Sequence, residues 1–178
     1  TWQFVAEKVG VEQNELKAKI LPLAALFSIG EHSRSLLFAL NDGALPSNTA
    51  GGYNLRVILR RALTFIDQYG WKLDLPTICE WHADYLKPLF PELGEHLDEI
   101  RKILDVEKSR YENTKQKTKS IVTALIEKKE AITTEKLLQL YDSNGIAPEL
   151  VREEAAPAGV MVAVPDNFYA LFAERPTQ

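Results

Sequence analysis

The sequence predicts an all-α fold, an irregular helical bundle with one long helix and little or no β structure. Three observations support this prediction. Apolar residues recur at helical spacing along most of the 178 residues. Residues 95–129 contain neither glycine nor proline, which is typical of one unusually long helix. The β-like run at residues 160–164 is too short to build a sheet.

The first part of the chain is expected to hold three helices. The first begins near residue 13 and bends at Pro22, because proline removes a backbone donor from the helical ladder. The second ends at the turn formed by residues 41–43. Residues 43–52 are rich in Gly, Pro, Ser and Asn and carry no charge, so they predict an ordered loop. A third helix follows over residues 53–69, with its apolar residues in a single stripe.

The middle of the chain predicts two more helices. One begins at Leu75 and ends before the proline-containing segment that starts at Pro88. The long helix over residues 95–129 follows it. Residues 107–120 within that helix hold Tyr111 as their one large apolar residue, so this stretch is expected to project into solvent or to face a polar partner.

The last part of the chain predicts shorter helices. The Thr133-Thr134 pair is typical of a helix N-cap, and the turn at residues 143–145 ends that helix. Pro148 begins a short helix. The apolar residues 160–164 are expected to pack back on the bundle, and Asp166 is expected to cap a final turn.

The length corresponds to about one domain. We therefore treat residues 1–178 as one helical domain, with residues 1–92 and 93–178 as its candidate subdivision. The sequence begins at Thr1, and its one methionine is Met161. We expect from this that the sequence is either a piece of a longer protein or a product left after removal of a tag.

Composition excludes several classes of protein. The longest charge-free apolar stretch, residues 20–30, has 11 residues and contains a proline, whereas a membrane span needs roughly 20. The single cysteine, Cys79, excludes an internal disulfide and fits a reducing compartment. No signal-peptide pattern is visible at the start. We expect a cytoplasmic protein without a membrane partner.

The net charge of −4 argues against a nucleic-acid-binding protein, but it hides a strong segregation of charge. Residues 101–129 hold nine basic and four acidic residues, a local net charge of +5, and the rest of the chain carries −9. Arg56 and Arg60 are four residues apart, so they are expected on one helix face, away from the apolar stripe, with Arg61 beside them. Such a surface would follow a phosphate backbone.

The alternative is a solvated helix face with internal salt bridges. Glu107 and Lys108 have Arg110 and Glu112 as neighbours at suitable spacing, so the long helix could satisfy its own charges.

The sequence lacks the patterns of common catalytic and metal sites. Cys79 and His82 make half of a zinc site, and His32 and His96 are far away in sequence, so we interpret the pair as partly buried helix residues. The glycine-containing loop lacks the lysine and hydroxyl of a phosphate-binding P-loop. We predict no catalytic residues and no metal ligands.

Several segments together resemble one family. They are residues 32–35, 41–43, 45–62 (LPSNTAGGYNLRVILRRA), 81–86 (WHADYL), 140–145 (LYDSNG) and 164–169 (VPDNFY). In this order they are similar to alanyl-tRNA synthetases, best to the archaeal-type branch, and they cover most of residues 30–175. Ala50, where a third consecutive glycine is usual, and Glu31 depart from the family's pattern.

The resemblance implies a helical middle region that grips the tRNA acceptor stem and reads the G·U wobble pair of alanine tRNA. It assigns the reading to Asn48 and Asp142, and it places Arg56, Arg60 and Arg61 beside the stem backbone. The chemistry is suitable, because a carboxylate accepts from the guanine amino group and an amide both donates and accepts in the wide minor groove of A-form RNA. The alternatives are that Asn48 is a turn or N-cap residue and that Asp142 caps a helix end or pairs with a lysine.

The resemblance also implies a larger enzyme of translation. Its class II aminoacylation core would precede this region and charge tRNA with alanine using ATP, and Mg²⁺ and zinc are expected elsewhere in that enzyme. This region alone is expected to bind no cofactor and to be inactive. Its expected partners are the acceptor stem of alanine tRNA and the N-terminal aminoacylation domain, not DNA. The alternatives are a helical protein–protein interaction module without RNA binding and a stand-alone helical regulator.

Overall fold

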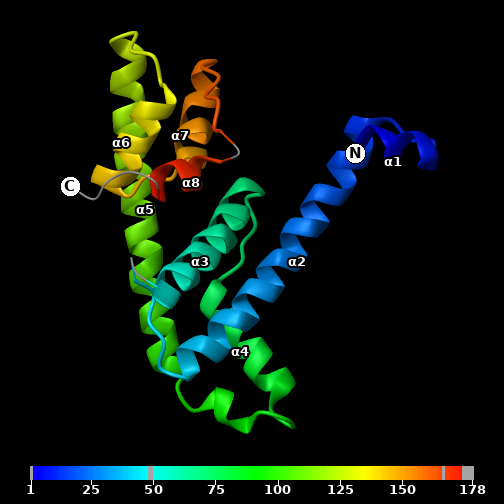
Figure 1. Ribbon diagram of the computed structural model, residues 1–178. Coiled ribbons are helices and arrows are strands. Elements are labelled where there is room, and N and C mark those ends of the chain that lie inside the picture. The colour runs from blue at the N-terminus through cyan, green and yellow to red at the C-terminus, as the bar shows by residue number, and fades with distance from the viewer. Residues whose placement is uncertain (1, 48–49, 166, 174–178) are drawn as a thin grey trace. The chain divides into compact units, whose positions relative to one another are not determined.

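The computed structural model describes residues 2–47, 50–165 and 167–173, and this part of the chain forms helices without a strand (Figure 1). The helices are α1 (Trp2–Val9), α2 (Gln13–Asn41), α3 (Ala50–Gln68), α4 (Leu75–Leu86), the 3₁₀ helix η1 (Pro91–Gly94), α5 (Leu97–Glu127), α6 (Thr134–Asn144), α7 (Pro148–Ala155), the 3₁₀ helix η2 (Ala156–Ala158) and α8 (Phe168–Ala173). The all-α prediction and the long helix late in the chain are confirmed, but α2, with 29 residues, is a second long helix that the sequence did not predict. Among the described helices, none combines the length and the apolarity needed to span a bilayer.

The chain divides into two compact units, and their boundary lies within α5. The N-terminal unit comprises residues 1–108 and the C-terminal unit residues 109–178. The subdivision after residue 92 stays a prediction.

Helix α2 is continuous, although the sequence predicts two helices in its place. Its first turn is capped by Glu12, whose carboxylate accepts from the backbone amides of Asn14 and Glu15. Pro22 lies inside the helix. A proline there costs about 3 kcal/mol, but Ala25 and Ile29, about one and two turns further along the same face, are buried, and this burial stabilises the helix against that cost.

The core of the N-terminal unit lies where α2 packs against α3 and α4 (Figure 1). The predicted stripe of α3 supplies its buried residues Leu59, Ala62 and Ile66. Helix α3 begins at Ala50, three residues before the predicted start, so both glycines of the loop motif belong to its first turn.

The polar middle of α5 is not uniformly exposed, which corrects the expectation for residues 107–120. Glu107, Tyr111 and Thr118 are all buried. The Thr118 hydroxyl donates to the Thr114 carbonyl at 2.7 Å, so its polar group is satisfied within the helix.

The C-terminal unit has its own apolar core, built from α6, α7 and the end of α5. The Thr133 hydroxyl accepts from the Lys136 amide, as the N-cap prediction requires. Val162 is buried in this core, with Val160 and Val164 packed against it, so the expected packing of this segment is confirmed. The predicted cap, Asp166, lies outside the described residues.

Candidate nucleic-acid interface

Arg56 makes a buried ion pair rather than facing solvent. Its Nε and Nη2 donate to the two carboxylate oxygens of Glu107, each at 2.9 Å. The two side chains are only 13% and 3% exposed. Arg56 therefore does not present its charge to solvent as a phosphate-following surface requires, and Glu107 is buried rather than on a solvated helix face. That Arg56 contacts tRNA stays a prediction. Its buried ion pair with Glu107 favours a structural role for Arg56.

The same guanidinium also reaches the loop before α3. Arg56 Nη2 donates to the Pro46 carbonyl at 3.4 Å. Because Glu107 belongs to α5, this one side chain connects the loop, α3 and the start of α5 within the N-terminal unit.

The loop lies directly against the first turn of α3. The Ser47 amide donates to the Gly52 carbonyl at 3.0 Å. A Cβ at position 52 would lie 2.5 Å from the Leu45 carbonyl oxygen and 2.2 Å from the Ser47 hydroxyl, so this close approach requires glycine. The predicted reading residue Asn48 follows at once but lies outside the described residues.

Arg60 and Arg61 differ in their environments. The Arg61 side chain is exposed, its guanidinium stands 5.6 Å from the centroid of the Phe65 ring, and it has no ion pair within the described part of the chain. Arg60 is half-buried. Of the three predicted arginines, Arg61 is the one whose charge is most open to a phosphate.

Not all of the basic residues of α5 are open to a ligand. Arg101 donates to the carboxylates of Asp74 and Glu80, which connects α5 to α4. Lys117 and Lys119, in the C-terminal unit, are exposed. The local excess of positive charge is thus partly used in packing and partly presented to solvent.

Asp142 lies on a well-anchored part of α6. Leu140 is buried in the core of the C-terminal unit. The Tyr141 ring packs edge-on against Phe168 and Phe172, at centroid distances of 5.8 and 4.7 Å. Two neighbouring anchors therefore fix the backbone while the Asp142 side chain is exposed.

The carboxylate of Asp142 has no structural task within the described residues. It makes no hydrogen bond and no ion pair there, and the helix end is capped by Gly145, whose amide donates to the Tyr141 carbonyl at 3.0 Å. A carboxylate in the last turn also meets the negative end of the helix dipole, which costs about 0.3–1 kcal/mol. An unfavourable residue without a structural partner is a signal of function.

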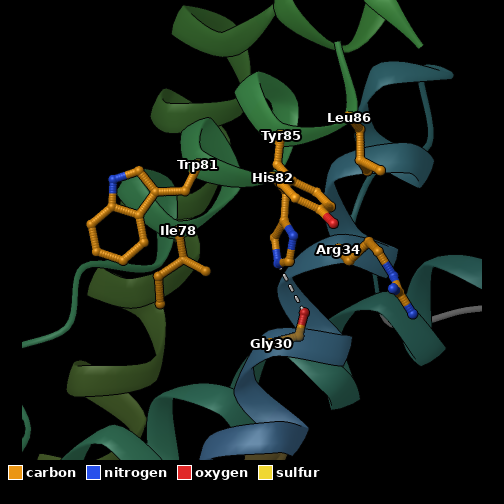
Figure 2. Close-up of a pocket in the computed structure, with 7 residues that line it drawn as sticks. All are labelled: Gly30, Arg34, Ile78, Trp81, His82, Tyr85 and Leu86. Atoms are coloured by element: carbon orange, nitrogen blue, oxygen red, sulfur yellow. Dashed lines mark hydrogen bonds between the residues drawn. The ribbon is translucent and has the colours of Figure 1, made fainter. Parts of the chain in front are cut away.

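Cys79 and His82 serve the packing of α4 on α2. Burial raises the pKa of the Cys79 thiol to about 12, and its S–H contacts the Ser33 carbonyl at 3.5 Å. His82 Nε2 lies 3.0 Å from the Gly30 carbonyl (Figure 2) and 3.0 Å from the Ser33 hydroxyl. Burial and, to a lesser extent, the charge of Arg34 lower the pKa of His82, although the Gly30 carbonyl opposes this. Within the described ranges, no three His, Cys, Asp or Glu side chains group as a metal site.

One supporting residue of this region, Glu107, is not apparent from the sequence alone. Glu107 is 51 residues from Arg56 along the chain, and only the tertiary fold brings the two together. The one feature of the sequence that could have pointed to Glu107 is that it is an acidic residue within a basic helix.

Comparison with known proteins points to the same family as the sequence motifs of this chain. The family model described as tRNA synthetases class II (A) matches residues 3–178. The alanine–tRNA ligase of Methanocella arvoryzae is 43% identical over 169 residues, which cover 95% of this chain and 19% of that protein. The alanine–tRNA ligase of Caldivirga maquilingensis is 38% identical over 171 residues, which cover 96% of this chain and 19% of that protein.

The alanine–tRNA ligase of Methanococcus maripaludis strain C5 is 36% identical over 179 residues, which cover 97% of this chain and 20% of that protein. The chain thus spans about a fifth of the length of these relatives. The resemblance found in the sequence motifs is confirmed, and the chain belongs to the class II (A) family of tRNA synthetases.

Proposed function

We propose that this chain is the tRNA-recognition region of an alanine–tRNA ligase and that it binds the acceptor stem of alanine tRNA at its G·U wobble pair. The observation that carries the proposal is Asp142, an exposed carboxylate on a rigid backbone with no partner among the described residues. In a wobble pair the guanine amino group lacks a full partner in the minor groove, and a carboxylate is a pure acceptor for it.

Asn48 is proposed to make the second base contact. Its amide can donate to one base and accept from the other. The preceding loop supports this role, because Ser47 is tied to Gly52 and Pro46 to Arg56. We therefore assign Arg56 to holding the loop, while Arg60 and Arg61 are proposed to face the stem backbone.

The proposal is tested by comparing affinity and stability in the same variants. Asp142→Ala should reduce the preference for a G·U stem over a matched G·C stem by about 1–3 kcal/mol, roughly 5–150-fold in relative affinity. The free energy of unfolding should stay unchanged or rise by a few tenths of a kcal/mol, because a repulsion with the helix dipole is removed. Gel shifts with both stems and urea titrations measure the two quantities.

Ser143→Ala is the matched control, since Ser143 is the exposed neighbour on the same turn. It should retain the wild-type preference. Asn48→Ala should lose preference as Asp142→Ala does. If both of these variants keep the wild-type ratio, the assignment of the reading residues is wrong. If the wild-type chain binds neither stem, a helical protein–protein interaction module becomes the better interpretation.

The catalytic steps are proposed to belong to the rest of the enzyme. Alanine activation with ATP, together with Mg²⁺ and zinc, would take place outside these residues, and this chain alone should not charge tRNA. The N-terminal unit has a surface suited to an apolar contact with an aminoacylation domain. The exposed large apolar residues there are Phe4, Val5 and Val9 on α1 and Ile20, Leu21, Leu23, Leu26 and Phe27 on α2. Ile20, Leu23 and Phe27 recur at helical spacing on one face of α2, and clustered apolar residues of this kind mark interaction sites.

A further inference from the structure

Glu107 is a charged side chain that is almost completely shielded from water. It lies on α5, within the N-terminal unit, and its side chain is 3% exposed. Removing a carboxylate from water is costly, and replacing a buried ion pair by apolar residues of similar size is often neutral or stabilising. Stability alone therefore does not explain why an ion pair occupies this place.

The Glu107 carboxylate fixes the orientation of one guanidinium. Its two oxygens accept from Nε and Nη2 of Arg56, each at 2.9 Å. Two parallel bonds between planar groups fix direction as well as distance, which a single point contact does not. Arg56 Nη2 carries a second N–H, and this nitrogen also donates to the Pro46 carbonyl at 3.4 Å. Glu107 thus determines where the donor for Pro46 lies.

The loop before α3 is held at two points that directly precede Asn48 in the chain. At one point the Ser47 amide donates to the Gly52 carbonyl at 3.0 Å, a contact within the backbone itself. At the other point the Pro46 carbonyl accepts from Arg56. Proline has no amide hydrogen, so its carbonyl is the one backbone group by which a hydrogen bond can hold it. The second point therefore depends on a side chain, and that side chain depends on its buried partner.

We propose that Glu107 is a positioning residue for tRNA selectivity, because through Arg56 it holds the loop that presents Asn48 to the G·U pair. This inference rests on the proposed function, since it concerns the same reading site. Glu107 itself is too buried to contact RNA. A side chain that reads a base must be held within about 0.5 Å of its productive position by supporting contacts. Loss of the Glu107 carboxylate should therefore reduce selectivity and leave the phosphate contacts in place.

The test uses the full 178-residue chain in gel shifts with the G·U stem and the matched G·C stem. Glu107→Gln keeps the size of the side chain but places an amide donor against the N–H groups of Arg56. It should lower the preference for G·U about fivefold or more, and the affinity for the G·C stem should stay close to that of the wild type. Glu99→Gln is the matched control, because Glu99 is an exposed glutamate of the same helix and unit. It makes the same change of charge and should keep the wild-type preference.

A double-mutant cycle separates positioning from a general loss of stability. A chain with Asn48→Ala keeps the proposed Asp142 contact, so a residual preference for G·U can still be measured. Adding Glu107→Gln to that chain should reduce the preference no further, because the residue that Glu107 positions is gone. An equal reduction in the wild-type and Asn48→Ala backgrounds overturns the proposal.

Replacing both partners of the ion pair separates selectivity from folding. Arg56→Met combined with Glu107→Leu exchanges the pair for apolar side chains of similar size, so this double variant should resist urea better than Glu107→Gln. It still lacks the donor for Pro46, and its preference for G·U should stay reduced. A stable double variant with the wild-type preference overturns the proposal. A preference that Asp142→Ala lowers and Glu107→Gln leaves intact overturns this inference alone, whereas a wild type without any preference overturns the proposed function with it.

Discussion

The guanidinium of Arg56 and the carboxylate of Glu107 form the most buried ion pair among the described residues. Removing one partner of such a pair leaves an uncompensated charge in a low-dielectric site, which costs about 3–5 kcal/mol. Arg56→Ala should therefore lower the free energy of unfolding by that amount in urea titrations. Arg61→Ala should change it by less than about 0.5 kcal/mol, because Arg61 is exposed. Equal effects of the two substitutions would contradict the supporting role of Arg56.

His82 makes stability depend on pH. Its pKa lies below the ordinary 6.5, because burial and Arg34 disfavour the charged ring more than Glu31 and the Gly30 carbonyl favour it. The unfolded chain then binds more protons than the folded chain once pH falls below about 6.5. The free energy of unfolding should decrease from pH 7 through the folded pKa of His82.

The variant His82→Gln should show a smaller decrease of unfolding free energy between pH 7 and pH 5. Part of the decrease should remain, since burial and Arg61 also lower the pKa of His32. Identical slopes for wild type and variant, measured by urea denaturation at each pH, would show that His82 is not responsible.

At the scale of elements, the junction between the loop and α3 depends on one glycine of an adjacent pair. A methyl group at position 52 would collide with backbone at Leu45, whereas the space around Gly51 is open. Gly52→Ala should destabilise the protein by about 1–3 kcal/mol. Gly51→Ala should stabilise it by about 0.5–1 kcal/mol, since alanine is the better helix residue. Melting temperatures of the two variants should move in opposite directions, and a shift of the same sign would refute the close contact.

At the scale of the whole molecule, charge is segregated along the chain. Residues 101–129 carry +5, while residues 74–99 carry −6. If the proposed function holds, Arg60→Ala and Arg61→Ala should each weaken binding to any stem. Each should reduce the slope of log affinity against log salt by about 1. Lys87→Ala, in the acidic segment, should leave that slope unchanged. Binding isotherms at several salt concentrations provide the measurement.

The sequence by itself determined the helical class, the long helix α5, the N-cap at Thr133 and the family. These follow from local spacing, from the absence of Gly and Pro and from ordered motifs, all of which act over short stretches of chain. Only the tertiary structure decided that α2 continues through Pro22, because the compensating burial of Ile29 comes from packing against other helices. It also decided that Arg56 turns inward to Glu107, since a contact between residues 51 positions apart depends on how helices pack, which local pattern does not encode.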